Sequence, residues 1–123
     1  MALSGNPQVE EINARGVEPV IIADPGNAGT FDVSRPGIIQ LTSVGVETRT
    51  LPDPVFRGQQ IDLVMVVDGG DITITASSPV NQTGHTSIVA SAVGGFIRLV
   101  GKYNATDGWE WQEIVEDTGI TTS

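Results

Sequence analysis

The residues best suited to chemistry lie together near the C-terminus, where two tryptophans alternate with carboxylate and amide side chains. Glu110 and Glu113 could suggest the carboxylate pair of a glycosidase, and the indole rings of Trp109 and Trp111 could stack on a sugar. The pattern predicts a strand, in which side chains three positions apart point to opposite faces. Glu110 and Glu113 therefore cannot flank one bond, and a glycosidase is disfavoured.

The two tryptophans share a face of this predicted strand because they are two positions apart. Two indoles on one face would bury a large apolar area or form a contact surface. We expect Trp109 and Trp111, together with Phe96, to pack in the core or between subunits. Ligand stacking on the tryptophans is the alternative interpretation.

The single histidine, His85, and the acidic turn around Asp68 offer little for catalysis or metal binding. The chain has no cysteine, which excludes thiol chemistry and thiolate metal sites, and one histidine cannot build a zinc site or activate a nucleophile as a pair. Asp68 and Asp71 flank two glycines, but a calcium loop needs more carboxylates at fixed spacing. We therefore expect no catalytic, cofactor-binding or metal-binding residues.

The charge of the chain argues against two classes of partner. Fifteen acidic residues against six basic ones give a formal net charge of −9, and no segment gathers positive charge. Because phosphate groups are bound by clustered Lys and Arg, we expect neither nucleic acid nor a membrane surface as a partner. No apolar segment approaches the ~18 residues of a membrane span, and the N-terminus lacks the pattern of a secretion signal.

The elements that must position these residues are predicted to be strands of one all-β domain. Valine and isoleucine far outnumber leucine in the 123 residues, and β-branched side chains favour pleated strands. Short apolar segments alternate with glycine-rich turns. This pattern is typical of an antiparallel β-sandwich or small barrel, of jelly-roll or tulip-like form.

The N-terminal residues 1–50 are predicted to form an extended arm. Asn6 and Pro7 signal the start of one short helix over residues 7–15, which Gly16 ends. So short a helix is marginal alone and would persist by docking on another surface.

Two β-rich segments, residues 17–23 and 37–48, complete the predicted arm. Pro19 cannot donate to a sheet, so it restricts the first segment to an edge strand or an extended arm. Residues 51–57 carry two prolines and predict a rigid extended connector to the rest of the chain.

Residues 58–115 are predicted to form a compact β knob. Residues 60–67 are apolar on both faces, which predicts a central strand. Asp68, Gly69 and Gly70 then predict a hairpin turn into the next strand.

The predicted knob ends with a second hairpin and one more strand. Residues 85–102 are divided by Gly94 and Gly95, which predicts the second hairpin turn. A strand over residues 109–115 follows, and residues 116–123 are predicted to be a polar C-terminal tail.

The knob carries a series of five motifs, DGGDITIT, NQTG, SIVASAVGG, FIRLV and DGWEWQEIV. Together they resemble the small β domains in structural proteins of tailed bacteriophages, especially head decoration (cement) proteins. The resemblance covers about residues 58–115. It implies a non-enzymatic virion component, made in the host cytoplasm and placed on the capsid surface. There it would form a homotrimer that stabilises contacts between major capsid protein subunits.

The arm is the element that we expect to hold this partner. An arm gains affinity by adding strands to a partner or by docking a short helix on it. The candidate partner-binding residues are Val9, Ile12, Val20, Ile21, Ile22, Phe31, Ile38 and Ile39. The alternative function is a carbohydrate-binding module or a tail-associated or fibre-associated β domain that uses Trp109 and Trp111, with Tyr103 as a further platform.

Overall fold

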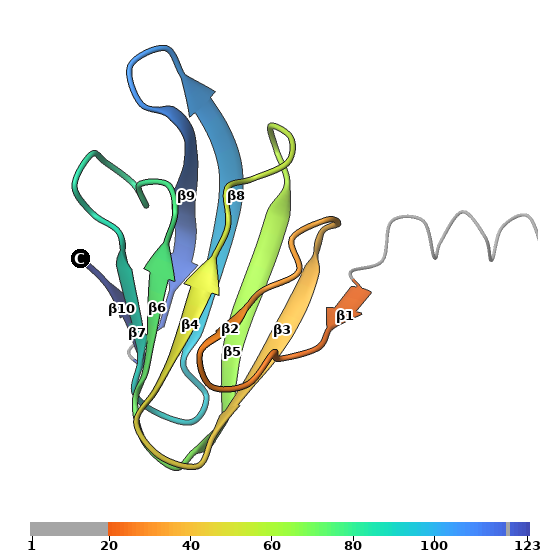
Figure 1. The fold of residues 1–123 in the computed structure, drawn as a ribbon, viewed down its shortest axis with the longest axis vertical. Coiled ribbons are helices and arrows are strands. Elements are labelled where there is room, and N and C mark those ends of the chain that lie inside the picture. The colour runs from red at the N-terminus through yellow and green to blue at the C-terminus, as the bar shows by residue number, and fades with distance from the viewer. Residues whose placement is uncertain (1–19, 118) are drawn as a thin grey trace, which may run out of the picture.

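The computed structural model describes residues 20–117 and 119–123, and within them the chain is all-β, as predicted (Figure 1). The strands are β1 Val20–Ile22, β2 Gly29–Thr30, β3 Gly37–Ser43, β4 Glu47–Leu51, β5 Gln60–Asp68, β6 Ile72–Ala76, β7 Ser87–Ala90, β8 Phe96–Asn104, β9 Gly108–Glu116 and β10 Ile120–Thr122. The helix predicted over residues 7–15, with Val9 and Ile12, lies outside the described residues.

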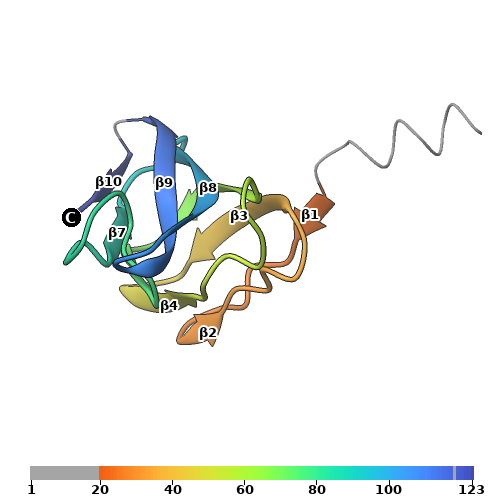
Figure 2. The same cartoon turned by 90° about the horizontal axis from the view of Figure 1, so that it is seen from above.

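The strands form two five-stranded sheets that face each other as two layers (Figures 1 and 2). Sheet A has the order β1-β3-β5-β8-β9, and sheet B has the order β10-β7-β6-β4-β2. Inward side chains from both sheets, such as Leu63 of sheet A and Ile74 of sheet B, belong to one buried core. The described strands do not close into a barrel, so that alternative is wrong, while β5 lies at the centre of its sheet as predicted.

Strands β1 to β6 alternate between the two sheets, so residues 20–76 form three stacked β-arches, named here the arch stack. Equivalent strands of successive arches pair in parallel: β1 with β3, β3 with β5, β2 with β4, and β4 with β6. Between two successive strands of one sheet, the chain crosses to the opposite sheet, forms a strand there and crosses back. The two strands of the first sheet therefore run in the same direction. The prediction of purely antiparallel sheets is therefore wrong, and both sheets are mixed.

Residues 87–122 pair in the opposite way and are named here the antiparallel segment. Strand β7 lies antiparallel to β6, β8 to β5, β9 to β8, and β10 to β7. These strands extend both sheets on one side of the arch stack, whereas β1 and β2 are the edge strands on the other side. The edge position of β1 agrees with the prediction for residues 17–23.

The predicted division into an arm and a knob does not hold for the described residues. Residues 20–50 contribute β1 and β3 to sheet A and β2 and most of β4 to sheet B. Leu41 pairs with Met65, and Leu51 pairs with Ala76, across the expected boundary. The apolar alternation of this part is satisfied inside the molecule, so it is not an extended arm.

Two glycine-rich turns that were predicted to close hairpins instead connect the two sheets. Strand β5 continues into β6 of the opposite sheet, and β7 continues into β8 in the same manner. A Cβ added at Gly70 would lie 2.4 Å from the carbonyl carbon of Gly45, and one added at Gly95 would lie 2.6 Å from that of Gly119. Glycine is required here because neighbouring turns stack closely on each other. The sequence pattern predicted tight hairpin turns at these glycines.

Two further boundaries differ from the prediction. Residues 37–48 are not one strand but divide into β3 and β4, because the Glu47 carboxylate accepts a hydrogen bond from Val44 N (2.9 Å) and closes a turn between them. Residues 116–123 are not a free polar tail. They include β10, where Ile120 is fully buried and pairs with Ala90 of β7.

Candidate binding surfaces

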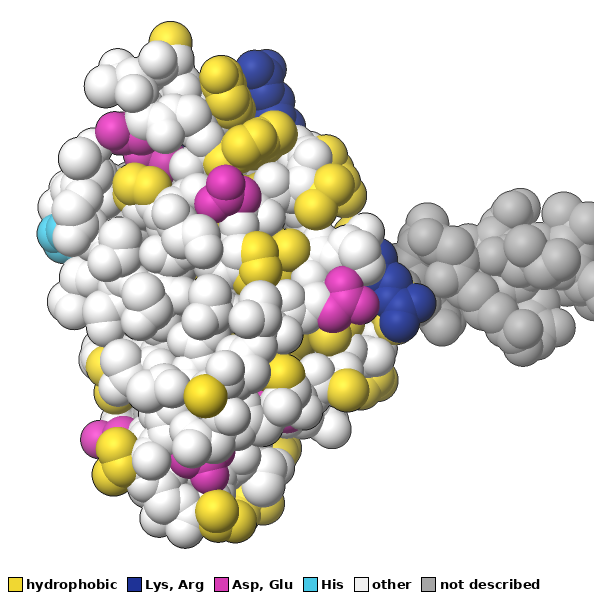
Figure 3. Space-filling view, in the orientation of Figure 1, with side chains coloured by type: hydrophobic (Ala, Val, Ile, Leu, Met, Phe, Trp, Pro, Cys, Tyr) yellow, Lys and Arg dark blue, Asp and Glu magenta, His cyan; other side chains and the backbone are white. Residues whose placement is uncertain are grey.

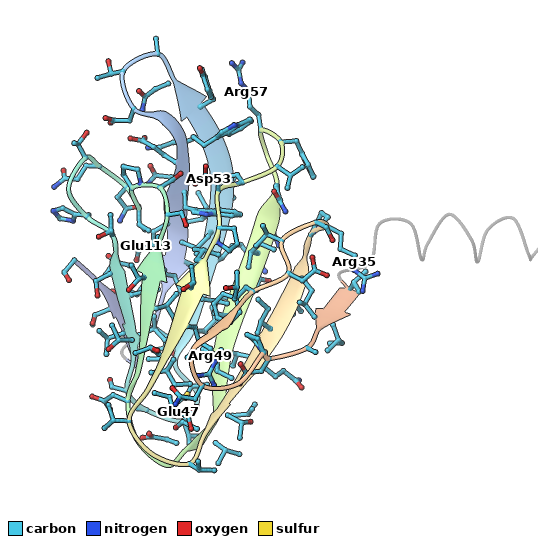
Figure 4. The ribbon with its side chains drawn as sticks, in the orientation of Figure 1. Arg35, Glu47, Arg49, Asp53, Arg57 and Glu113 are labelled. Atoms are coloured by element: carbon cyan, nitrogen blue, oxygen red, sulfur yellow. The ribbon has the colours of Figure 1, made fainter. Side chains whose placement is uncertain are left out.

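A buried arginine joins the turns of the arch stack at the lower end of the molecule (Figure 4). Arg49 is 1% exposed, and its guanidinium donates to both carboxylate oxygens of Asp24, from Nε at 2.7 Å and from Nη2 at 3.1 Å. Its Nη2 also lies 2.9 Å from Glu47 Oε1 and donates to Thr42 O. A buried charge with this many partners is a structural brace between successive arches.

The brace shifts the pKa of both carboxylates in the same direction. Burial acts to raise the pKa of Asp24, but hydrogen bonds from Arg49 and from the backbone N–H groups of Thr42 and Gly26 bring it below its ordinary value. The N–H of Val44 and the guanidinium lower the pKa of Glu47. Both carboxylates are therefore held in the charged form that the arginine needs.

The opposite end of the molecule presents an aromatic cluster, named here the aromatic tip, which consists of Val55, Phe56, Arg57, Tyr103 and Trp109 (Figures 3 and 4). Tyr103 and Trp109 are cross-strand partners of the β8–β9 hairpin, with ring centroids 5.2 Å apart at an angle of 78°. The Arg57 guanidinium lies 5.3 Å from the Tyr103 ring centroid. Phe56 is 43% exposed and Tyr103 is 47% exposed, so both are accessible to a partner.

The loop that carries three of the five aromatic-tip residues is fixed to β8 by its backbone. Gly58 N donates to Gly101 O (2.8 Å), and Gly101 N donates to Gln59 O (2.7 Å). A Cβ at Gly101 would lie 2.6 Å from the Cβ of Pro54, so only glycine permits this contact. Main-chain hydrogen bonds therefore hold the loop of Phe56 against β8.

Gln59 braces the same loop from inside the protein. It is fully buried, its Oε1 accepts from Val55 N (2.7 Å), and its Nε2 donates to Val33 O (2.6 Å). The buried amide is satisfied at both ends. A loop held in this way is preorganised, which lowers the entropy cost of binding a partner.

The two tryptophans of β9 have different environments, although they point to the same side of sheet A. Trp111 is fully buried, and its indole Nε1 donates to Pro52 O (2.9 Å), which ties the proline-rich connector to the core. Trp109 is partly exposed in the aromatic tip. Trp111 therefore packs in the core and cannot stack on a ligand, whereas Trp109 can contribute to a contact surface.

The outer face of sheet A is a second candidate surface, named here the apolar face. Its apolar members are Ile21, Ile38, Val64, Phe96, Val100 and Val115, and the same face also carries Gln40, Gln60, Asp62, Arg98, Lys102, Glu110 and Gln112. Arg98 and Asp62 form a two-point ion pair, with Nε–Oδ1 at 3.0 Å and Nη2–Oδ2 at 3.1 Å, and the guanidinium carbon lies 5.8 Å from the Phe96 ring centroid. No described strand packs against this face.

The predicted partner-binding residues divide between the core and the apolar face. Ile22, Phe31 and Ile39 are buried in the core, so they cannot contact a partner in this arrangement. The reason is that they point inward from strands or loops that belong to the two-sheet body. Ile21 and Ile38 do lie on the apolar face, and Val20 is half-buried at the start of β1.

The remaining candidates for chemistry are separated or satisfied. Glu110 pairs with Lys102 (3.3 Å), which also donates to Asn81 O (3.2 Å), whereas Glu113 accepts from Asn81 Nδ2 (3.1 Å). Glu110 and Glu113 are three positions apart in a regular part of the β8–β9 ladder, so their side chains leave opposite faces of β9. Asp68 Oδ1 accepts from the backbone N–H of Gly70 as an ordinary turn residue. Within the described residues, no three His, Cys, Asp or Glu side chains gather as potential metal ligands.

The sequence did not indicate three of the five residues of the aromatic tip. Val55, Phe56 and Arg57 were interpreted as part of a rigid connector because two prolines lie beside them. Phe56 and Arg57, which follow two prolines, could have indicated a contact surface in the sequence, because aromatic residues and arginine are common at such surfaces.

Comparisons with known proteins do not assign the chain to a family. No protein-family model matches it, and neither does any curated protein. Residues 20–117 and 119–123 contain no helix of the length and apolar character that a membrane crossing requires. The fold, the two candidate surfaces and the motif resemblance are therefore the basis for a functional proposal.

Proposed function

We propose that this chain is a non-enzymatic head decoration protein of a tailed bacteriophage. In this proposal it binds the outer surface of the capsid as a homotrimer and stabilises contacts between major capsid protein subunits. The motif resemblance of residues 58–115 suggests this role, and the aromatic tip is the structural observation that carries it. The two facing sheets would serve as a rigid, sandwich-type knob that presents this tip.

The composition of the aromatic tip favours a protein partner. Tyrosine, tryptophan and arginine are enriched among the residues that dominate binding energy at protein interfaces, and the tip combines Tyr103, Trp109 and Arg57. The opposite end exposes Val44 and Val46, but valine is under-represented among such residues. We therefore place capsid attachment at the aromatic tip instead of the predicted arm.

The geometry of the rings is less suited to a sugar. Stacking on a sugar needs an accessible ring face, but Arg57 lies over the ring of Tyr103, and Trp109 meets Tyr103 edge to face. Trp111 is buried. Carbohydrate binding, or a place in a tail or fibre, remains the second candidate, because the Tyr103 side chain is 47% exposed.

Co-sedimentation with empty heads tests the proposal, using heads assembled from the major capsid protein encoded in the same genome. The full chain should bind them, and Phe56→Ala or Tyr103→Ala should weaken the affinity at least about tenfold, which corresponds to about 1.4 kcal/mol. Val93→Ala is the matched control, because Val93 is exposed but lies in the turn between β7 and β8. Heads that bind no wild-type chain would overturn the proposal.

A glycan array with the same variants separates the second candidate. Glycan binding that is lost in Tyr103→Ala and kept in Val93→Ala would favour the carbohydrate module. Head binding that is equal in all variants would move the attachment site away from the aromatic tip and contradict the structural argument.

A further inference from the structure

Arg57, the cation of the aromatic tip, forms no ion pair with any residue in the described part of the chain. The cations Arg49, Arg98 and Lys102, in contrast, each pair with a carboxylate. Carboxylates are plentiful, because the chain has fifteen acidic residues against six basic ones. Arg57 is therefore available for a carboxylate that another molecule supplies.

The carboxylates near the aromatic tip have other partners. Asp53 lies in the loop that carries Arg57, and it accepts a hydrogen bond from the Ser78 hydroxyl. Asp107 lies in the turn between β8 and β9, and it accepts a hydrogen bond from the Thr83 hydroxyl. Neither carboxylate pairs with Arg57, so the tip keeps a local positive charge on a molecule whose formal net charge is −9.

The guanidinium of Arg57 is held in a position where a partner can reach it. Arg57 is exposed, and its guanidinium lies over the ring of Tyr103, 5.3 Å from the ring centroid, at the upper end of the molecule (Figure 4). A guanidinium uses its flat face for such a contact, so the N–H groups at its edge can still donate. No described residue accepts a hydrogen bond from them.

We propose that the aromatic tip recognises an acidic segment of its protein partner, in which a carboxylate pairs with Arg57 and apolar groups beside it pack on Phe56 and Tyr103. This inference rests on the proposed function, because it takes the partner to be the major capsid protein. It adds the chemistry that the partner must present.

Both parts of this recognition follow from what the tip exposes. The planar, forked N–H donors of arginine match the two oxygens of a carboxylate, and such two-point pairs are among the stronger hydrogen-bonded contacts in proteins. Val55, Phe56 and Tyr103 are exposed around the cation, so a segment with carboxylates alone would leave this apolar area uncovered. The fitting segment therefore carries an acidic residue beside apolar ones.

The net charge of the chain explains why the cation matters for an acidic partner. The body of the molecule repels such a partner, whereas Arg57 attracts it at the point of contact. Salt screens both effects, but removal of Arg57 removes only the attraction. The difference in salt dependence between the wild type and an Arg57 variant therefore reports the contact itself.

The test measures affinity of the full chain for heads at about 0.1 M and about 1 M salt, between which the Debye length falls from about 10 Å to about 3 Å. Arg57→Gln should raise the dissociation constant at least about tenfold at the lower salt concentration and less at the higher one. Arg57→Lys keeps the charge but not the fork, so its loss should be smaller.

Arg35→Gln is the matched control and should bind heads as the wild type does. Arg35 is also exposed, but it lies beside β1, away from the tip (Figure 4). Thermal unfolding of each variant verifies that it is folded. If Arg57→Gln does not fold, Arg57→Lys decides the result by the same comparison.

A second arm uses heads whose surface carboxylates have been converted to neutral amides with a carbodiimide and methylamine. Such heads should bind the wild type more weakly than untreated heads do. Arg57→Gln should show little further loss on them, because its contact with the carboxylate is already absent. A loss in Arg57→Gln that is equally large on untreated and amidated heads would exclude a carboxylate as its partner.

The outcomes separate this inference from the proposed function. Heads that bind the wild type and Arg57→Gln equally well at both salt concentrations would overturn the inference and leave the capsid function in place. Heads that bind no wild-type chain would reject the proposed function, and the inference with it. Binding to acidic glycans on an array, without binding to heads, would assign Arg57 to a sugar carboxylate and overturn the protein partner.

Discussion

The arch stack and the antiparallel segment share one core but stabilise it in different ways. The arch stack places charged and amide groups inside the molecule, namely Arg49, Glu47 and Gln59. The antiparallel segment buries mainly apolar side chains, which are Ile88, Ala90, Ile97, Leu99, Trp111 and Ile120, together with one charged residue, Glu110. The chain changes sheets at every turn of the arch stack, whereas the antiparallel segment contains the β8–β9 hairpin, which stays within sheet A.

Arches need polar support because their turns cross the end of the core. Backbone groups in such turns lose water without gaining a sheet partner, so side chains must satisfy them. Arg49 donates to the carbonyls of Thr42 and Thr48, and Gln59 satisfies Val55 and Val33. In the β8–β9 hairpin the ladder itself satisfies most backbone groups.

The largest expected effect comes from separating the two parts. A chain that begins at Pro52 loses β1 to β4 and the loops between them, including six core side chains, Ile22, Phe31, Val33, Ile39, Leu41 and Leu51. At roughly 1.5–3 kcal/mol each, their loss amounts to about 9–18 kcal/mol, which is as large as the whole stability of a typical domain. We expect this chain to be unfolded by circular dichroism and to show no cooperative thermal transition. A cooperative thermal transition of this shortened chain would show that the knob folds independently of residues 1–51.

Replacing the brace should weaken the arch stack strongly. Arg49→Met leaves the carboxylates of Asp24 and Glu47 without their partner, and breaking a buried ion pair in this way costs about 3–5 kcal/mol. Denaturant unfolding measures this loss. Arg35→Met is the matched control because Arg35 is exposed, and its effect should stay within about 0.5 kcal/mol. Equal stability of the two variants would refute the structural role of the brace.

In the antiparallel segment, a smaller loss is expected from the indole hydrogen bond of Trp111. Trp111→Phe leaves the carbonyl of Pro52 unpaired and should lower the free energy of unfolding by about 1–3 kcal/mol. Trp109→Phe makes the same change at a partly exposed position and should cost less. If Trp109→Phe proves the more destabilising variant in denaturant unfolding, the assignment of Trp111 to the core and Trp109 to the tip is reversed.

The two parts should respond to pH in opposite directions. Asp24 and Glu47 have folded-state pKa values below their ordinary values of 3.8 and 4.5, so their contribution is complete above these values and is lost as the pH falls through the folded pKa. Unfolding free energy measured from pH 6 to pH 3 should therefore decrease. In Arg49→Met this decrease should be shallower, because the guanidinium no longer lowers the two pKa values, although the backbone N–H groups still do.

The smallest effect concerns Glu116 in the antiparallel segment. Burial and the neighbouring Glu113 raise the pKa of Glu116, so the stability tied to its protonated form is present at low pH and is lost as the pH rises through the folded pKa. Glu116→Gln should raise the melting temperature slightly at pH 7 and have no such effect near pH 4. A higher melting temperature at pH 4 only would contradict this sign.

Local patterns predicted the strands far better than their connections. Residues 60–67 are apolar on both faces, and β5 is indeed a central strand of its sheet. The same kind of glycine turn, however, precedes β6 and β8 without forming a hairpin in either place. Spacing along the chain does not distinguish a turn within a sheet from a crossing between sheets, because both need a few small residues.

The candidate surfaces were predictable only in part. Trp109 and Trp111 were correctly placed on one side of a strand, yet their different burial depends on where sheet B ends beneath them. Phe56 and Arg57 join Tyr103 only because Gly101 lets their loop approach β8. Contacts between residues so distant in sequence leave no local pattern.

By itself, the sequence determined that this protein is built from strands, because β-branched residues dominate its apolar content and glycines interrupt it at short intervals. It also determined the alternation that makes one face of each strand apolar. Only the tertiary structure decided that successive strands change sheets and stack in parallel. That choice depends on contacts across the core, such as the pairing of Arg49 with Asp24, whose energy appears only when the arches are stacked.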